Sequence, residues 1–220
     1  MTTIQFVQKR IFDVSLAFLG IIVLLVPMVI VAAMIRLTSS GPILYLQIRV
    51  GKHGIPFRIL KFRTMTVGAD KQGSITTTKD QRITRIGRWL RRLKLDEFPQ
   101  LFNVLVGKMS FVGPRPDVPG YADLLEGDER KVLELIPGIT GPASIVFRDE
   151  EVILANVDDP IQFNDHVIFT EKVRLNLEYL HRWSLMRDIG FILITVFPVF
   201  NHWFKLVDNN IPDVLFKQNE

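Results

Sequence analysis

Two adjacent carboxylates, Asp96 and Glu97 (the dyad), follow directly after a strongly basic stretch. Nearby positive charges favour the charged form of a carboxyl group, so we expect both side chains to be held ionised. Pro99 follows, and proline is tolerated in the first turn of a helix, which makes Asp96 the expected N-cap of a helix over residues 100–106. A helix N-terminus also favours an anion such as a phosphorylated aspartate. Taken alone, such a pair is usually a cap.

Two stiff turns further along the chain have the composition of phosphate-binding loops. Arg115 lies between Pro114 and Pro116, so its loop has little entropy to lose, and its guanidinium offers a forked donor for phosphate oxygens. Residues 137–142 (PGITGP) form a second turn, whose glycines allow backbone N–H groups to approach a ligand. Either could be a turn and nothing more. Beside the dyad they indicate phosphate chemistry.

Positive and negative charges are divided unevenly along the chain. Residues 1–115 carry 18 Lys and Arg against five Asp and Glu, whereas residues 116–220 carry nine against 18. A basic half beside an apolar segment fits an anionic membrane surface or phosphorylated ligands, and nucleic acid is not an expected partner. The lack of cysteine excludes disulfides, thiolate metal sites and cysteine nucleophiles. With 48% hydrophobic residues, the chain is not of the disordered class.

Residues 14–35 form an uncharged run of 22 residues, long enough to cross about 30 Å of hydrocarbon as a helix. The run is too long for a signal peptide, so we expect it to stay in the mature protein. Basic residues flank both ends, and the positive-inside rule therefore selects no orientation. Pro27, near the middle, should bend or break the helix. Two topologies fit: a helix–break–helix that enters and leaves on the cytoplasmic face, and a kinked single span.

Residues 43–50 and 57–64 alternate apolar and polar side chains around a glycine-containing turn at 51–54, which predicts a β-hairpin. These segments and their turn carry five basic residues and no acid: Arg49, Lys52, Arg58, Lys61 and Arg63. The hairpin is therefore either a solvated basic surface or part of an anion site.

Residues 82–95 are predicted to form an amphipathic helix, because apolar residues and arginines each recur every three or four positions. Such a helix can lie among lipid headgroups with Trp89 at the boundary, or pack on the core with a solvated basic face. Residues 174–182 are also predicted to be helical. The apolar residues 189–200 are too few to span a membrane and are expected as an interfacial or core helix.

Six segments together resemble the bacterial sugar transferases that act as monotopic phosphoglycosyl transferases. In chain order they are KRIFD (9–13), the apolar run interrupted at Pro27, KFRTM (61–65), LDEFPQLFNVL (95–105), MSFVGPRP (109–116) and PGITG (137–141). They extend over residues 9 to about 188, and KFRTM, LDE…QLFNVL and FVGPRP are the most specific. With no large N-terminal extension, the chain is similar to the short, catalytic-core form.

The resemblance implies transfer of a sugar 1-phosphate from a UDP-sugar to undecaprenyl phosphate, through a covalent phosphosugar-aspartate and with release of UMP. By its position in the motif, Asp96 corresponds to the nucleophile and Glu97 to the carboxylate associated with Mg²⁺. Arg91 and Arg115 match basic residues around the diphosphate. The weaker substrate-binding candidates are Lys61, Arg63 and Arg148.

The resemblance also implies a fold and a cellular setting. We expect an α+β, mostly helical enzyme with a small hairpin, a re-entrant membrane helix (1–40), a catalytic domain (41–188) and an interfacial helix with a tail (189–220). It would lie in the bacterial inner membrane, face the cytoplasm and contact anionic headgroups, with a homodimer as a candidate assembly. The product would initiate a lipid-linked glycan such as an O-antigen, capsule, exopolysaccharide or glycoprotein glycan.

The chain departs from the family pattern at four places, all outside the dyad. Val26 replaces a serine, Lys108 an acidic residue and Asn176 a frequent aspartate, and residues 142–144 read PAS in place of WAQ. The rival reading from another class is a non-enzymatic, basic membrane-surface adaptor anchored by residues 14–35. CDP-alcohol phosphotransferases would need several spans and a multi-aspartate motif, which the sequence lacks.

Overall fold

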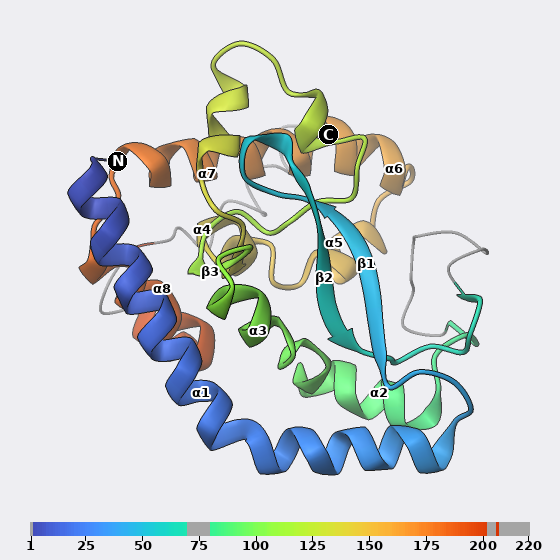
Figure 1. Cartoon of the computed structure of the whole chain (residues 1–220). Coiled ribbons are helices and arrows are strands. Elements are labelled where there is room, and N and C mark those ends of the chain that lie inside the picture. The colour runs from blue at the N-terminus through green and yellow to red at the C-terminus, as the bar shows by residue number, and fades with distance from the viewer. Residues whose placement is uncertain (1, 70–79, 202–205, 207–220) are drawn as a thin grey trace.

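A long helix, α1 (Thr3–Thr38), runs along two sides of the molecule in the computed structural model (Figure 1). The structure describes residues 2–69, 80–201 and 206. The helix begins at a capping box, in which Thr2 and Gln5 exchange hydrogen bonds between side chain and backbone N–H. It is long and apolar enough to cross a membrane, and 17% of its most apolar window is buried inside the protein.

Pro27 lies inside α1, and the helix bends sharply part-way along its course (Figure 1). Proline removes one backbone hydrogen bond and its ring presses on the preceding turn, which is a common cause of such a bend. The α-helix nevertheless continues on both sides of Pro27, because the loss of a single hydrogen bond does not end it. The expected helix–break–helix is therefore a continuous, bent helix.

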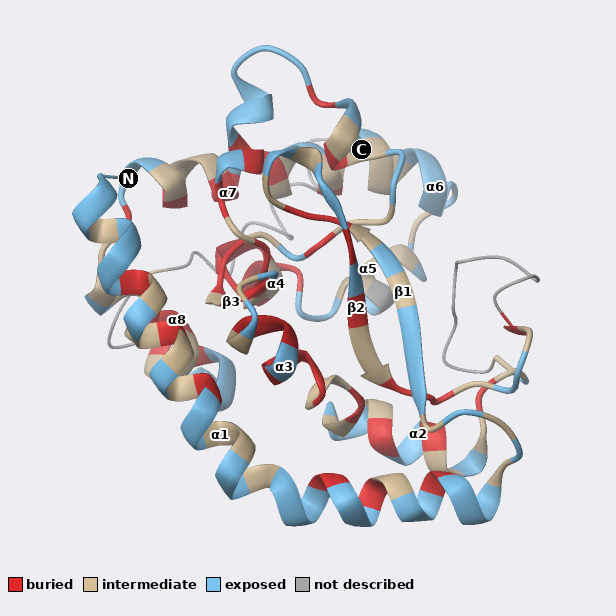
Figure 2. Ribbon diagram, viewed as in Figure 1, coloured by how far each residue is buried: buried red, intermediate tan, exposed pale blue. Residues whose placement is uncertain are grey.

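One stripe of α1 packs on the rest of the protein, and the remaining surface is apolar and exposed. The buried stripe comprises Lys9, Asp13, Ala17, Met28, Val31 and Ile35. Elsewhere, large apolar side chains from Ile4 to Leu37 are exposed (Figure 2). An apolar surface of this extent marks an interaction site, and on a helix of this length it indicates a membrane protein.

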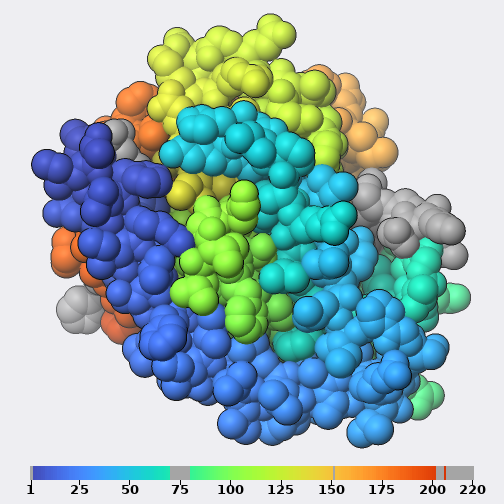
Figure 3. All heavy atoms as spheres, viewed as in Figure 1, coloured from blue at the N-terminus to red at the C-terminus, as the bar shows by residue number. Residues whose placement is uncertain are grey.

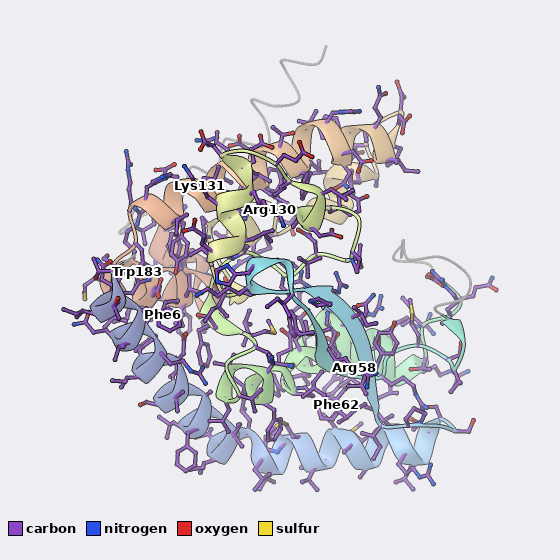
Figure 4. All side chains as sticks on the ribbon, turned by 45° about the horizontal axis from the view of Figure 1, so that its top comes forward. Phe6, Arg58, Phe62, Arg130, Lys131 and Trp183 are labelled. Carbon is purple, nitrogen blue, oxygen red and sulfur yellow. The ribbon has the colours of Figure 1, made fainter. Side chains whose placement is uncertain are left out.

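The predicted β-hairpin is confirmed, since β1 (Leu44–Val50) pairs antiparallel with β2 (Pro56–Phe62) from the Leu44–Phe62 pair onward. A 3₁₀ turn (Lys52–Gly54) connects the two strands. The Phe62 side chain packs in a cluster with side chains from the second half of α1 (Figure 4). The hairpin is thus fixed against the membrane-facing helix.

The basic stretch folds as a short helix, α2 (Arg85–Arg92), capped by the side chain of Thr84. It is shorter than the predicted helix over 82–95. At its start Ile83 forms an isolated bridge to the segment after β2, and at its end Lys94 adopts a left-handed conformation with φ 56°. Both features remove residues from the helix.

A 3₁₀ turn (Leu95–Glu97) joins α2 to α3 (Gln100–Leu105). The predicted N-cap at Asp96 is wrong, because the chain completes this extra turn before α3 begins and Pro99 occupies the cap position. Figure 3 shows α3 between α1 and the hairpin. The Asn103 side chain joins α3 to β2, accepting and donating one backbone hydrogen bond at 2.9 Å each.

The two stiff turns lie side by side. β3 (Ser110–Val112) pairs in parallel with β4 (Gly138–Thr140), and two 3₁₀ turns (Ala122–Leu124 and Glu129–Glu134) lie in the crossover between them. The Gly113 N–H donates a hydrogen bond to the last residue of β4 at 2.9 Å. A Cβ at Gly113 would lie 2.2 Å from a backbone oxygen, so glycine is needed for this close approach.

The C-terminal half is helical. Its elements are α4 (Pro142–Val146), α5 (Glu150–Leu154), α6 (Pro160–Phe163), a π-helical turn (Asn164–Ile168), α7 (Phe169–His181), α8 (Leu185–Val196) and a 3₁₀ turn (Pro198–Phe200). The helices predicted over 174–182 and 189–200 correspond to α7 and α8. Phe191 and Ile194 of α8 are buried in one cluster with residues of α4 and α7, so α8 is a core helix.

A buried ionic network fixes the first half of α1 to this helical half. Lys9 Nζ lies 2.6 Å from Asp188 Oδ2. The Tyr179 hydroxyl and the indole N–H of Trp183 also donate hydrogen bonds to the Asp188 carboxylate. Figure 4 labels Trp183. Asp13 accepts a hydrogen bond from the backbone of β3 at 3.1 Å. The membrane-facing helix is therefore joined to β3, the strand that precedes the Pro114-Arg115-Pro116 loop (the arginine loop).

Candidate active site

The dyad lies in the 3₁₀ turn Leu95–Glu97, on the wall of a cleft of about 1860 Å³. The cleft is lined by residues of α1 and α2 as well as α7 and α8. The left-handed conformation of Lys94 turns the chain out of α2 just before the two carboxylates. Because Asp96 is 8% exposed, this turn holds one carboxyl group largely away from solvent.

Glu97 is clamped by two cations. Its Oε1 atom lies 3.1 Å from Lys61 Nζ and 2.8 Å from Arg115 Nη2. Burial would raise the pKa of Glu97, but Arg115 and Lys61 outweigh it and lower the pKa to about 2. Glu97 is therefore ionised at any physiological pH.

Asp96 has a different environment. Burial raises the pKa of Asp96, the charge of Glu97 adds to the increase, and Lys61 and Arg91 oppose it. Its Oδ1 atom is buried and accepts no hydrogen bond from any residue that the structure describes. The expectation that nearby cations favour the charged form is confirmed for Glu97, whereas at Asp96 desolvation outweighs the attraction of the cations and raises the pKa.

Three predicted basic residues approach the dyad from three different elements. Lys61 comes from β2, Arg91 from the last turn of α2, and Arg115 from the loop after β3. Arg91 Nε donates a hydrogen bond to the Thr64 hydroxyl at 2.9 Å, which fixes its side chain at the cleft. The Arg115 side chain is 53% exposed and Glu97 raises its pKa, so its guanidinium is charged and accessible to an anion.

The other predicted residues bind elsewhere. Arg63 also lines the cleft, but its Nη2 donates hydrogen bonds to the carbonyl and hydroxyl oxygens of Ser39 and holds the end of α1. Arg148 lines the cleft, but its Nη2 donates to the Thr195 carbonyl near the end of α8 at 3.0 Å. Pro27 belongs to the bend of α1 and has no place in the dyad's surroundings.

Two further residues hold the arginine loop, and one of them, Asp117, has no motif that singles it out. Arg49 Nη1 donates a hydrogen bond to the Pro116 carbonyl at 3.1 Å, and the backbone at the end of β1 donates to the Asp117 carbonyl. Burial raises the pKa of the Asp117 side chain to about 6, against the opposing charges of Lys172 and Arg49. Only its position could have pointed to Asp117 in the sequence, because it directly follows the rigid Pro-Arg-Pro segment.

This arrangement suits phosphate chemistry. Guanidinium and ammonium groups bind phosphate oxygens, and an unpaired carboxyl oxygen is free to approach a phosphorus atom. Among the described residues there is no group of three or more His, Asp or Glu that could hold a metal ion. The adjacent carboxylates of the dyad are the remaining donor set for a cation that also binds substrate phosphates.

The chain is similar to known proteins over most of its length. It is 41% identical over 197 residues to an undecaprenyl-phosphate glucose phosphotransferase of Komagataeibacter xylinus, covering 86% of this chain and 35% of that protein. It is 37% identical over 198 residues to the UDP-glucose:undecaprenyl-phosphate glucose-1-phosphate transferase of Escherichia coli K12, covering 87% and 40%. The chain thus spans well under half the length of these two relatives.

A relative of similar length exists as well. The uncharacterized sugar transferase EpsL of Bacillus subtilis is 34% identical over 190 residues, with 86% of each chain covered. The model of the family described as "Bacterial sugar transferase" matches residues 4–202, which include α1, the dyad and both stiff turns. On these matches the chain belongs to the bacterial sugar transferase family.

Proposed function

We propose that the protein transfers a sugar 1-phosphate from a UDP-sugar to undecaprenyl phosphate, with Asp96 as the nucleophile. The observation that carries the proposal is the buried Oδ1 of Asp96, which has no hydrogen-bond partner among the described residues and lies on the cleft beside three cations. The names of relatives from two organisms, which specify glucose transfer to undecaprenyl phosphate, support the reaction class.

The first step forms a covalent intermediate. The ionised Asp96 carboxylate attacks the β-phosphorus of the UDP-sugar, a new P–O bond forms, and the bond from this phosphorus to the bridging oxygen breaks. The bridging oxygen and its electron pair leave with UMP. The second step reverses the roles, since an oxygen of undecaprenyl phosphate attacks the same phosphorus and Asp96 departs as a free carboxylate. Covalent catalysis divides one hard displacement into two easier ones.

The cations stabilise the charge that moves during both displacements. Arg115 and Lys61 lie 2.8 and 3.1 Å from Glu97. Arg91 adds a third positive charge from the last turn of α2. Fixed donors aimed at developing charge need no reorganisation during the reaction, and one such donor is commonly worth about 10²–10³ in rate. We infer that these three residues bind the diphosphate, and that Arg63 instead holds the end of α1 in place.

Mg²⁺ fits the donor set of the dyad. Magnesium binds through one or two carboxylates together with substrate phosphates, and Glu97 and Asp96 are adjacent on one turn with the Oδ1 of Asp96 unpaired by any described residue. Glu97 is the residue that would hold the ion. When bound, the ion would neutralise negative charge on the diphosphate.

We further propose that α1 is re-entrant, with the catalytic part on the cytoplasmic face of the inner membrane. Both ends of the helix contact the same domain: Lys9 binds Asp188 near one end, and Ser39 binds Arg63 at the other. A straight helix that crosses about 30 Å of hydrocarbon would separate its ends to opposite sides. The bend at Pro27 allows both ends to return to one side.

The decisive experiment measures UMP release by the purified protein with Mg²⁺, undecaprenyl phosphate and a panel of UDP-sugars. The wild type is expected to release UMP and, without the lipid acceptor, to gain the mass of one sugar phosphate on Asp96. Asp96→Asn is expected to abolish both signals, whereas the surface control Asp128→Asn should retain them. An adduct on another side chain, or full activity of Asp96→Asn, overturns the assignment.

A further inference from the structure

Two buried polar atoms that helices α4 and α7 contribute to the cleft are not explained by the dyad chemistry. They are the hydroxyl oxygen of Ser144 and the amide oxygen Oδ1 of Asn176, and neither has a hydrogen-bond partner among the residues that the structure describes. Buried polar groups in proteins are nearly always paired, with protein or with bound water. Two unpaired ones on the wall of one cleft therefore point to a ligand.

Asn176 has no evident structural role on α7. It is 6% exposed, and it lines the cleft together with Lys172 one turn earlier on the same helix. Leaving a buried acceptor unpaired costs about 1–3 kcal/mol, and asparagine is also a poor residue for a helix interior. A leucine, whose side chain has the same branching and number of heavy atoms, would avoid both penalties, so the fold gains nothing from the amide.

Ser144 faces the same cleft from the neighbouring helix. It lies in α4, directly after the PGITG turn, and α4 packs against α7 through a shared cluster that includes Ala143 and Leu175. The two unpaired atoms thus come from two helices that are packed together. We call the part of the cleft wall that Ser144 and Asn176 line the amide pocket.

Electrostatics connect the amide pocket to the phosphate-binding residues. The charge of Arg115 is stabilised by Glu97 and Asp96 and also by Glu150. Glu150 in turn pairs with Lys172 of α7 at 2.7 Å, one turn from Asn176. Arg115 and Lys172, which lies one turn from Asn176, therefore both interact with Glu150, and all of these residues line the one cleft that holds the dyad.

We propose that Asn176 and Ser144 bind hydroxyl groups of the hexose carried by the donor, and that Asn176 is the residue that selects the hexose. This inference rests on the transfer reaction proposed above. Each sugar hydroxyl both donates and accepts, as do an amide and a serine hydroxyl, so the pocket can pair with neighbouring hydroxyls on one ring. The uracil ring presents similar donors and acceptors, and the experiment distinguishes the two.

The test compares hexose and deoxyhexose donors in the full-length protein. The best substrate of the wild type is chosen from UDP-glucose, UDP-galactose and their N-acetylamino counterparts, and its single deoxy analogues are then measured as kcat/KM for UMP release. A site built to hydrogen-bond a hydroxyl rejects an analogue that lacks it, and we expect the wild type to discriminate at one position by at least about 100-fold.

Asn176→Leu is expected to lose this discrimination. Its kcat/KM for the parent sugar should fall to about that of the wild type with the deoxy analogue, and removal of the hydroxyl should then cause no further loss. Ser144→Ala should show the same pattern at a hydroxyl of the same ring. Asn156→Leu, a matched change at an exposed position outside the cleft, should leave both rates unchanged.

Two further measurements distinguish loss of hexose binding from loss of uracil binding and from a folding defect. UMP inhibition constants should be equal in wild type and Asn176→Leu, and a proportional loss of UMP affinity would mean that uracil binds in the pocket. The melting temperature of Asn176→Leu should be unchanged or higher, whereas Asn103→Leu, which breaks two hydrogen bonds to β2, should melt lower. Unchanged deoxysugar discrimination in a folded Asn176→Leu that still releases UMP overturns this inference and leaves the transfer reaction intact.

Discussion

Arg115 Nη2 lies 2.8 Å from Glu97 Oε1, although 18 residues and two secondary-structure elements separate the two positions in the chain. The contact exists because β3 leads into the Pro-Arg-Pro loop and because β3 is held by β4 on one side and Asp13 of α1 on another. The position of the guanidinium therefore depends on the fold around it.

Arg115→Lys is expected to lower the rate of UMP release by about 10²-fold. Lysine retains the charge but lacks the planar fork that can contact Glu97 and a phosphate together. Stopped-flow or coupled measurement of UMP release at saturating donor checks the value. Arg182→Lys, at an exposed ion pair of α7, is the control and should be neutral. A rate within twofold of the wild type would show that the planar fork of Arg115 is not needed for the reaction.

Adduct formation should fall with decreasing pH at values above the ordinary aspartate pKa of about 3.8. The nucleophile must be ionised, and burial raises the pKa of Asp96, so the inactive protonated form appears earlier on acidification. Glu97, with a pKa of about 2, contributes nothing above pH 4. Single-turnover adduct yield against pH checks this dependence. The same profile in Asp117→Asn separates any contribution from the group that titrates near pH 6.

Asp117→Asn is expected to stabilise the protein near pH 8 by up to about 3 kcal/mol. A carboxyl pKa raised to about 6 on folding means that ionisation opposes the folded state, with the penalty absent below about pH 4 and complete above pH 6. The gain in melting temperature should therefore vanish at pH 4. Asp128→Asn, at a fully exposed pair with Lys131, should give no gain at either pH.

Asp188→Asn should destabilise the protein by about 3 kcal/mol, because it removes the nearer counter-charge of the buried Lys9 and leaves only Asp13, at 4.0 Å. Thermal unfolding of the detergent-solubilised protein measures the loss. The double variant Lys9→Met with Asp188→Asn removes both charges and should recover part of it. A melting temperature of Asp188→Asn equal to that of the wild type would show that the ion pair contributes little to holding α1.

The topology of α1 can be tested with single cysteines, because the chain has none of its own. Cysteines placed at Thr3 and Ser40 are expected to react with an impermeant reagent from the same, cytoplasmic side of the membrane. Pro27→Ala restores the missing hydrogen bond and should straighten the helix, moving some molecules to a state with the two labels on opposite sides. Opposite-side labelling in the wild type contradicts the re-entrant topology.

The hairpin, the helices over 174–182 and 189–200 and the apolar helix could be predicted because each has a local cause. Alternating side chains over 43–64 specify a hairpin in any environment that buries one face, and the uncharged run over 14–35 fits a long helix. The dyad and the two stiff turns could be recognised in the sequence for the same reason, because the residues of a short motif are adjacent in the chain.

Tertiary structure decided what local pattern could not. Asp96 and Glu97 are neighbours in the sequence, yet burial raises the pKa of one and two cations lower the pKa of the other. The proximity of Lys61 and Arg115 to the dyad, and the packing of α4 against α7, arise from contacts between elements distant in the chain. Sequence determines which groups exist, whereas desolvation and long-range contacts depend on the completed fold.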